Sequence, residues 1–303
     1  MTTARPARLG VAAAVLALLT ACSAAPAGAP VEEPALAVDE GLRALLPEEV
    51  REAGVLTVAT DASYPPASSF GADGRTVVGL EPELMAGMGA LLGVRVEFRL
   101  SDFDAMLDDL TAHRVDLVMS AMTDTAERQG QADFVDYFRA GTSIVVQRGN
   151  PHGVHDLAGL CGEAVAVEAG TVQVGLLERS QERCEDDPIR VQTHATNDDA
   201  LVELRTGRVT AVLTDYPPAV FTTTNQRTQG AFQLVSDVQY EPGLYGIAVS
   251  KDRVGLRDAL AGALQRLVDS GAYAEALRTW EVDSGAVSEV TVNGGASSPL
   301  PAP

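Results

Sequence analysis

Arg128 and the pair Gly170-Thr171 are residues whose types could hold an anion. The planar guanidinium of Arg128 can grip a carboxylate with two parallel hydrogen bonds. Beside Glu127 it could instead form an exposed ion pair of little energetic weight. Gly170-Thr171 stands where an expected strand meets an expected helix, and free amides at a helix start attract an anion. A plain N-cap is the other interpretation of Thr171, and both can hold, because a capping threonine leaves neighbouring amides available.

Expected strands and helices alternate through the part of the chain that must position these residues. The strands are short and mainly apolar: Val55–Ala59, Val94–Phe98, Val115–Met119, Ala164–Glu168, Ile189–Gln192, Thr210–Leu213 and Tyr245–Val249. The helices have apolar residues at helical spacing: Pro82–Leu92, Phe103–Ala112, Val172–Glu182, Asp198–Arg205 and Gly255–Val268. Because parallel neighbours need helical crossovers, two such series predict an α/β fold of two lobes, each a mainly parallel sheet flanked by helices.

The last expected strand and helix, 245–249 and 255–268, fit poorly as a lobe of their own. They fit better if the chain returns to the first lobe after building the second, which leaves two segments crossing between the lobes. Two crossing segments form a hinge, and the cleft between hinged lobes is where small ligands bind. We therefore expect a two-stranded hinge beside an interlobe site.

The N-terminal segment indicates export. Arg5 and Arg8 precede the apolar run Leu9–Leu19, which is the layout of a bacterial secretory signal. This run is shorter than the ~20 residues that a transmembrane helix needs. Leu19-Thr20-Ala21-Cys22 resembles a lipobox, in which the cysteine becomes the acylated first residue; ordinary signal cleavage, with Cys22 incidental, is the alternative. We expect a lipid anchor on Cys22 at the outer face of the cytoplasmic membrane.

Composition sets the remaining boundaries. The stretch after Cys22 and the far C-terminal stretch are rich in Ala, Gly, Pro and Ser or Glu and lack a core-forming pattern. The expected parts are a lipoprotein signal peptide (1–21), a lipidated cysteine with a flexible tether (22–41), the first part of lobe 1 (42–143), lobe 2 (144–243), the return segment of lobe 1 (244–282) and a disordered tail (283–303).

Charge and residue types exclude several function classes. With 22 Lys and Arg against 42 Asp and Glu, the net charge of -20 should repel polyanions, so nucleic acid is not an expected partner. The four histidines are scattered, at His113, His152, His155 and His194, so neither a metal site nor a cofactor is expected. No Walker phosphate loop or Ser-His-Asp arrangement with a nucleophile motif is found.

Cys161 and Cys184 form an even pair in an oxidising compartment, which favours a disulfide. Closing this loop would contribute ~3 kcal/mol in the chain-entropy model. Two buried free thiols are the alternative, because sequence does not show that the side chains meet.

Several stretches, taken in order, resemble the periplasmic amino-acid-binding proteins of ABC importers, the family-three solute-binding proteins. The stretches are Gly54–Pro66, Gly79–Leu84, Asp116–Arg128, Asp133-Phe134, Val167–Thr171, Asp215-Tyr216 and Tyr245–Val249. Each is weak alone, but their order and spacing cover nearly all of the folded unit. The resemblance implies the two-lobed type II periplasmic-binding fold and an extracytoplasmic monomer that hands its ligand to ABC permease subunits.

The resemblance also implies a set of ligand-binding positions: Asp61, Tyr64, Ser120, Ala121, Thr123, Arg128, Glu168, Thr171 and Asp215. It places Arg128 and Thr123 on the ligand carboxylate, and Asp215 with the Ser120 carbonyl on the ammonium. Tyr64 would lie along the ligand side chain. Asp215 could instead be a turn or cap residue, and Tyr64 an ordinary core residue.

The residues around the ligand's variable end favour a polar or basic amino acid. Asp61 and Glu168 are expected there, and their negative charge suits a cationic or amide side chain. Relatives usually carry aromatic residues where Ala67 and Leu80 stand, so the cage is expected to be more open on one side. We expect no enzymatic activity. The alternatives are a cyclohexadienyl-dehydratase-like enzyme on the same fold, with Glu168 as an acid, and a ligand-sensing lipoprotein.

Overall fold

The computed structural model describes residues 1–3 and 37–295. Contacts divide the chain into two units, residues 1–35 and 36–303, and the fold below is that of the second unit. Nearly all of the expected signal peptide, Cys22, and the tether up to residue 36 lie outside the described residues, as does 296–303. Within the described part, none of the helices is long and apolar enough to cross a bilayer.

Every expected strand and helix has a counterpart in the structure. The helices are α1 (Glu40–Arg43), α2 (Glu48–Ala53), α3 (Leu80–Leu92), α4 (Met106–Thr111), α5 (Val172–Ser180), α6 (Asn197–Arg205), α7 (Tyr216–Thr224), α8 (Val254–Ser270) and α9 (Ala272–Thr279). The strands are β1 (Val55–Thr60), β2 (Ser63–Tyr64), β3 (Ser68–Phe70), β4 (Val77–Val78), β5 (Arg95–Leu100), β6 (Leu117–Val118), β7 (Ala132–Gln147), β8 (Ala164–Glu168), β9 (Arg190–His194), β10 (Ala211–Asp215), β11 (Phe232–Leu234) and β12 (Tyr240–Ser250). The elements that the sequence did not predict include α1, α2, α7, α9, the small sheet β2-β3-β4 and the long strand β7.

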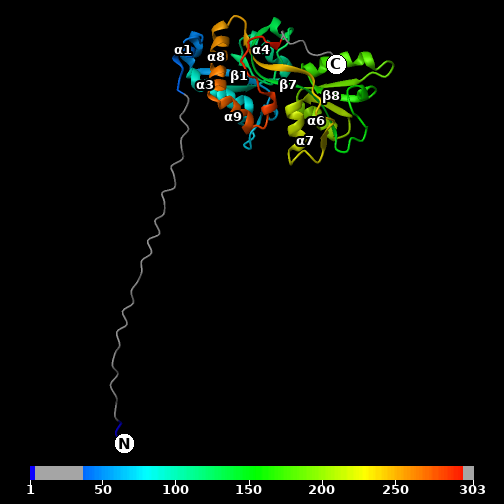
Figure 1. Ribbon diagram of the computed structural model, residues 1–303, viewed down its shortest axis with the longest axis horizontal. Helices are drawn as coiled ribbons and strands as arrows, with labels where there is room; N and C mark the ends of the chain where they lie inside the picture. Colours follow the sequence, from blue (N-terminus) through cyan, green and yellow to red (C-terminus); the bar gives the residue numbers. More distant parts are fainter. Residues whose placement is uncertain (4–36, 296–303) are drawn as a thin grey trace. The chain divides into compact units, whose positions relative to one another are not determined.

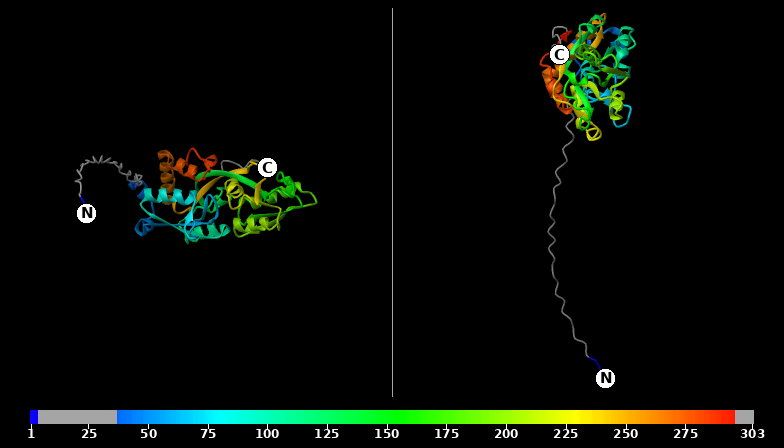
Figure 2. Two further views of the ribbon diagram at one scale, coloured as in Figure 1. Left: turned by 90° about the horizontal axis from the view of Figure 1, so that it is seen from below. Right: turned by 90° about the vertical axis from the view of Figure 1, so that its right-hand side faces the viewer.

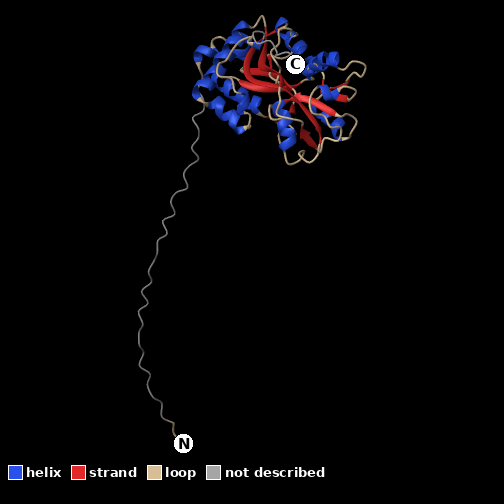
Figure 3. Cartoon of the chain, turned by 45° about the vertical axis from the view of Figure 1, so that its right-hand side comes forward, coloured by secondary structure: helices blue, strands red, loops and turns tan. Residues whose placement is uncertain are grey.

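One sheet runs through the fold in the order β5-β1-β6-β12-β7-β10-β8-β9, with β11 also paired to β7. Figure 3 shows the strands in red among the helices. Its two outer parts are parallel: β1 pairs with β5 and β6, and β8 pairs with β9 and β10. Helical crossovers join these parallel strands, as the alternating sequence predicted. We call the part built on β1, β5 and β6, with the return segment, lobe 1, and the part built on β8, β9 and β10 lobe 2.

Strands β7 and β12 form the two-stranded hinge. The first part of β7 pairs antiparallel with β12, from Ala132 opposite Ser250 to Ala140 opposite Gly243. The second part pairs with β10, from Thr142 to Val146, so this strand passes from lobe 1 into lobe 2 (Figure 2). The α/β fold with two lobes and a two-stranded hinge is therefore confirmed. The expected boundaries at 143/144 and 243/244 fall inside these two crossing strands.

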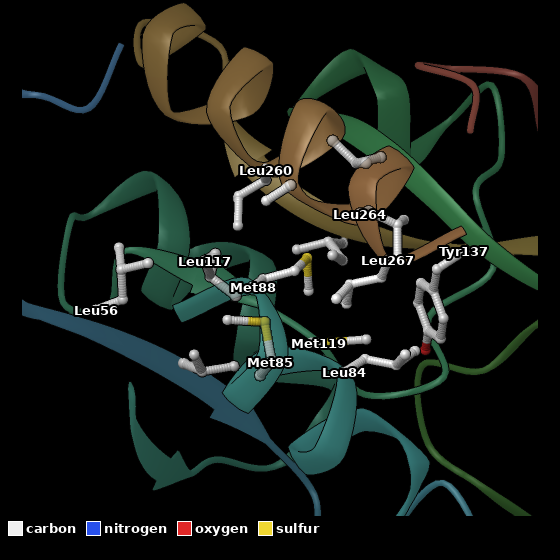
Figure 4. Close-up of a cluster of buried hydrophobic side chains, with 14 of the residues drawn as sticks. Leu56, Leu84, Met85, Met88, Leu117, Met119, Tyr137, Leu260, Leu264 and Leu267 are labelled. Carbon is white, nitrogen blue, oxygen red and sulfur yellow. The ribbon is translucent and has the colours of Figure 1, made fainter. Parts of the chain in front are cut away.

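Each lobe packs apolar side chains on both faces of its part of the sheet. In lobe 1, alternate residues of β1 and β6 point to opposite faces, so Leu56 and Leu117 join one buried cluster while Ala59 and Val118 join another. Helices α3, α8 and α9 cover the first face and α4 contributes to the second (Figure 1). Figure 4 shows side chains of β1, α3 and α8 meeting in the larger cluster. Lobe 2 has two corresponding clusters.

The expectation of a disordered tail from residue 283 was wrong for residues 283–295. A short turn spans Asp283–Gly285, and Val292 forms a β-bridge with Val135 of β7. The amide of Asn293 donates to the Phe134 carbonyl at 2.9 Å, and its side-chain oxygen accepts from the Phe134 amide at 2.8 Å. We call residues 286–295 the C-terminal strap. Hydrogen bonds hold the strap to β7, and Val287 and Val290 pack against the buried cluster of lobe 1.

The tether is also shorter than expected at its C-terminal end. Helix α1 begins at Glu40, and the Asp39 side chain caps it by accepting from the Leu42 amide at 3.1 Å. The Asp39 amide donates to the Leu91 carbonyl at the end of α3. Residues from 39 onward therefore belong to lobe 1.

Candidate ligand-binding site

All nine residues expected at the binding site line one cavity between the lobes, together with Phe103, Val172 and Gln173. From lobe 1 come Asp61 and Tyr64, which follow β1, and a loop after β6 that carries Ser120, Ala121 and Thr123. From lobe 2 come Glu168 and Asp215, at the ends of β8 and β10, and Thr171, before α5. Ligands in α/β folds bind outside the carboxyl ends of parallel strands. The structure brings the nine residues together; that they bind a ligand remains a prediction.

Glu81 of α3, which the sequence did not single out as a functional residue, holds the loop after β6 in place. Its carboxyl accepts hydrogen bonds from the Ala121 amide, the Tyr137 hydroxyl and the Ser68 hydroxyl. The side chain is completely buried, and this burial raises its pKa. Ala121 has a φ of 48°, a left-handed conformation that costs energy for a residue with a Cβ. The hydrogen bond from Ala121 to Glu81 therefore stabilises a strained turn at the site.

Arg128 reaches across the cleft. Its Nη1 donates to the Thr123 carbonyl at 2.7 Å, and its Nη2 donates to the Gly170 carbonyl of lobe 2 at 2.9 Å. The guanidinium carbon lies 5.4 Å from the centre of the Phe103 ring, within the range of a cation–π interaction. Burial lowers the pKa of Arg128 to about 10, so the side chain stays charged at neutral pH. The guanidinium thus lies at the cavity wall, as the functional interpretation requires.

Asp215 and Tyr64 meet from opposite lobes. The Tyr64 hydroxyl donates to Asp215 Oδ2 at 3.1 Å, while Gln173 Nε2 donates to Asp215 Oδ1 at 2.7 Å. Asp215 occupies the N-cap position of α7, but its side chain makes no capping hydrogen bond. Its carboxyl instead lines the cavity, where burial raises its pKa to about 6. At neutral pH this carboxyl can be ionised and can accept from an ammonium.

No side chain caps the first backbone amides of helix α5. Thr171 is the N-cap residue, yet its hydroxyl donates to the Glu168 carbonyl at 2.7 Å instead of accepting from the helix. Gly170 just before it has a φ of +73°, and an added Cβ would lie 2.7 Å from the Cβ of Asp104 in lobe 1. Glycine is therefore required both for the turn and for the close approach of the lobes. The free amides remain available to an anion.

Asp61 and Glu168 face each other from opposite lobes. Asp61 accepts from the Ser63 amide at 2.7 Å and from the Ser63 hydroxyl at 3.0 Å. Burial, followed by the nearby Asp61 carboxyl, raises the pKa of Glu168 to about 10. Glu168 is only 6% exposed, and its Oε1 is buried without a hydrogen-bond partner among the described residues.

Three cavity residues were missed by sequence reasoning. Gln173 donates a hydrogen bond to Asp215. It lies two residues beyond the resembling stretch Val167–Thr171, and this nearness was a usable signal. Phe103 begins an expected helix, and nothing in the sequence separated it from a core residue. A second, mainly apolar cavity borders Tyr64 and is lined by Ala67 and Leu80 among others. Ala67 and Leu80, where aromatic residues were expected in relatives, are themselves buried in lobe 1.

The site can satisfy both charges of an amino acid's α-carbon. The end of the cavity formed by Arg128, Thr123 and the start of α5 can bind a carboxylate. Asp215 can accept hydrogen bonds from an ammonium. The carboxyls of Asp61 and Glu168 lie elsewhere in the same cavity. Among the described residues, no group of three or more His, Cys, Asp or Glu side chains is arranged to hold a metal ion.

Cys161 and Cys184 form a disulfide in lobe 2, with their Cα atoms 5.2 Å apart. Cys184 belongs to the same buried cluster as Leu160, Leu176 and Leu177. The bond closes the region between the start of β8 and the end of α5, which carries Glu168 and Thr171. It therefore supports the lobe 2 side of the site.

Comparisons with known proteins agree with this geometry. The family model of bacterial extracellular solute-binding proteins, family 3, matches residues 56–283. The arginine-binding protein ArgT of Corynebacterium glutamicum is 29% identical over 258 residues, which cover 83% of this chain and 82% of that protein. Among solved structures, an ancestral arginine-binding protein bound to arginine has a TM-score of 0.68 at 32% identity, over 75% of this chain and 98% of the other. An ancestral amino acid-binding protein described as a precursor of cyclohexadienyl dehydratase has a TM-score of 0.69 at 27% identity, over 77% and 98%.

Proposed function

Because this chain belongs to the bacterial extracellular solute-binding proteins of family 3, we propose that it captures a polar or basic amino acid and delivers it to an ABC permease. Two of the proteins named above are arginine-binding proteins, which supports an amino-acid ligand for this chain. Export agrees with the extracellular family and with the N-terminal Arg5, Arg8 and apolar run.

One observation carries the proposal: a guanidinium and a carboxyl stand in one cavity between the lobes. Arg128 supplies a planar donor for the ligand carboxylate, and Asp215 supplies an acceptor for its ammonium. A zwitterion held by both residues would replace the direct bond that Arg128 now makes to Gly170. Such a ligand favours the closed arrangement of the lobes, which is the form the permease would recognise.

The test is a thermal-shift screen of the purified protein with arginine, lysine, ornithine, glutamine, glutamate and aspartate. A ligand at 100 times its Kd adds about 2.7 kcal/mol to the free energy of unfolding, so a specific ligand gives a clear rise in Tm. Arg128→Ala should abolish that rise. Arg95→Ala, at an exposed arginine of β5, is the matched control and should keep it. Tighter binding of glutamate or aspartate than of the other four contradicts the expected preference for polar or basic side chains.

We propose further that Cys22 carries a lipid that anchors the protein outside the cytoplasmic membrane. The sequence Leu19-Thr20-Ala21-Cys22 supports this proposal. Cells fed radioactive palmitate should label the wild-type protein, and Cys22→Ser should lose the label. Labelling that persists in Cys22→Ser would contradict the anchor.

A second candidate function, a dehydratase, is favoured by one feature of the site. Glu168 is a buried acid with a raised pKa, as a general acid requires, and one structural neighbour is a precursor of cyclohexadienyl dehydratase. Incubation of the protein with prephenate or arogenate decides the question. Formation of the aromatic product, lost in Glu168→Gln, would replace the binding function proposed above.

A further inference from the structure

We propose that the C-terminal strap positions the two residues assigned to the ligand carboxylate, Thr123 and Arg128, by holding Asp124 in place. The strap does not line the cavity, so it acts on the ligand only through this aspartate. It also lies beyond residues 56–283, the range that the family model matches. The proposal rests on the proposed amino-acid-binding function and gives the strap a role in affinity besides its packing on lobe 1.

Contacts along its length fix the strap before it reaches Asp124. Val287 and Val290 pack against the larger buried cluster of lobe 1. Farther along, the Thr291 hydroxyl and the Gly294 amide donate to Asp136 Oδ2 at 2.7 and 2.9 Å, and Asp136 is completely buried. The backbone amide that follows is therefore held at a defined place, which a freely moving chain end could not provide.

The Asp124 carboxylate joins the strap to the turn that begins at Arg128. Its Oδ2 accepts from the Gly295 amide at 2.7 Å, and its Oδ1 accepts from Gln129 Nε2 at 2.7 Å. Gln129 lies in the short 3-10 helix Arg128–Gly130. Because Asp124 is only 3% exposed, water cannot readily replace either donor. One carboxylate thus connects the end of the strap to the residue next to Arg128.

The loop that Asp124 holds is closed by its own hydrogen bonds. The Arg128 amide donates to the Thr125 hydroxyl at 3.2 Å, and the Gln129 amide donates to the Thr125 carbonyl at 2.9 Å. Arg128 Nη1 donates to the Thr123 carbonyl at 2.7 Å. A movement of Asp124 therefore displaces both Thr123 and the guanidinium, whose grip on a carboxylate depends on geometry.

Loss of the Gly295 amide would loosen this arrangement. Asp124 Oδ2 would lose its donor in a buried place, and a buried polar group without a partner is costly. If Asp124 turns to water instead, it breaks its bond to Gln129 and frees the turn at Arg128. The ligand carboxylate would then have to order the turn as it binds, and this cost lowers the affinity.

The experiment removes only the end of the strap. A chain ending at Asn293 lacks the amides of Gly294 and Gly295 but keeps both hydrogen bonds between Asn293 and Phe134. A chain ending at Ala296 keeps the whole strap and is the matched control.

Titration calorimetry measures the Kd of both chains for arginine, lysine, ornithine, glutamine, glutamate and aspartate. The temperature is one at which circular dichroism shows each protein folded. We expect the shorter chain to bind the preferred amino acid about tenfold more weakly than the control. A strap that only stabilises lobe 1 would leave the Kd unchanged, because the comparison is between folded proteins.

Two further measurements test the route through Asp124. Asp124→Ala should weaken binding to a similar degree, and combining it with the chain ending at Asn293 should add little, because both changes break the same link. Asp108→Ala, at an exposed aspartate of α4, is the matched control and should bind as the wild type. Hydrogen–deuterium exchange should become faster over residues 122–130 in the shorter chain and stay unchanged over β8 and β10 of lobe 2.

The outcomes separate the role of the strap from the proposed function. Equal Kd values for the chains ending at Asn293 and Ala296 overturn the positioning role and leave amino-acid binding intact. Additive losses from Asp124→Ala and the shorter chain overturn the route through Asp124. If Asp124→Ala does not fold, unchanged exchange over residues 122–130 in the shorter chain overturns that route instead. The absence of binding with all six amino acids in the full-length protein overturns the proposed function, and the role of the strap with it.

Discussion

Tyr64 of lobe 1 and Asp215 of lobe 2 are joined by hydrogen bonds in both directions. The Tyr64 hydroxyl donates to Asp215 Oδ2 at 3.1 Å and accepts from the Asp215 amide at 2.9 Å, and it also accepts from Thr214 at 3.0 Å. A single hydroxyl therefore connects the lobes beside the carboxyl assigned to the ligand ammonium.

Tyr64→Phe should weaken amino-acid binding by about tenfold to a hundredfold, because a hydrogen bond to a charged group contributes about 1.5–3 kcal/mol. The phenyl ring remains, so apolar contact with the ligand is kept. Calorimetric titration measures the change. Tyr216→Phe, which removes the hydroxyl of a residue next to Asp215 that does not line the cavity, is the control. Equal affinities of Tyr64→Phe and the wild type would show that the lobe contact does not support binding.

Replacing both cysteines of the disulfide, Cys161→Ser with Cys184→Ser, should lower the free energy of unfolding by about 3 kcal/mol, since the closed loop restricts the unfolded chain. Urea unfolding of the oxidised wild type and the variant measures this difference. Ligand affinity should change little, because neither cysteine lines the cavity. A variant as stable as the wild type contradicts the prediction.

Asp136 on β7 should make stability fall as pH rises. Burial, followed by the nearby Asp124, raises the folded-state pKa of Asp136 to about 7 from an ordinary value of 3.8. Between these values the unfolded chain has lost a proton that the folded chain keeps, so the free energy of unfolding falls by up to ~1.4 kcal/mol per pH unit.

The comparison for this prediction is Asp136→Asn, which cannot ionise and keeps an oxygen that accepts from Thr291 and Gly294. Urea unfolding at pH 5, 6 and 7 should give a smaller decrease in stability with pH than in the wild type. Asp283→Asn, at an exposed aspartate, is the control and should retain the wild-type dependence. If Asp136→Asn retains it too, another group causes the dependence.

Removing the C-terminal strap should destabilise lobe 1. A chain ending at Gly285 loses the donors that Thr291 and Gly294 supply to buried Asp136, and each unsatisfied group costs roughly 1–3 kcal/mol. A chain ending at Gly295 keeps these bonds and is the matched control. Thermal unfolding of the two truncated proteins measures the difference. Equal melting temperatures would show that the strap adds no stability.

The sequence predicted the lobes well because their strands are short apolar runs separated by helices with a clear period. It did not predict β7, where Asp133, Asp136 and Gly141 interrupt the apolar pattern. Two of these residues are explained only by tertiary structure: Asp136 binds the strap, and an added Cβ on Gly141 would meet Gln239 and Tyr240 within 3 Å.

At the candidate site, too, the sequence did not predict the residues whose roles depend on tertiary contacts. The nine predicted residues stood in stretches that resemble a known family, so their grouping in one cavity followed from order and spacing. Glu81 and Phe103 were not predicted as functional residues. Glu81 is buried, but in the sequence it looks like an exposed acid of a helix, and the buried Phe103 looks like an ordinary core residue. Only the three-dimensional contacts to Ala121 and Arg128 give them roles.

The strap ends beside both the cavity-lining loop that follows β6 and the hinge strand β12. The Gly295 amide donates to Asp124 Oδ2 at 2.7 Å, and the Asp124 amide in turn donates to the Leu244 carbonyl of β12 at 2.7 Å. Asp124 directly follows Thr123, which lines the cavity. A Cβ added at Gly295 would collide with the Asp124 carbonyl oxygen, so only glycine lets the strap approach this junction so closely, and any labelling or tagging of the protein has to avoid residue 295.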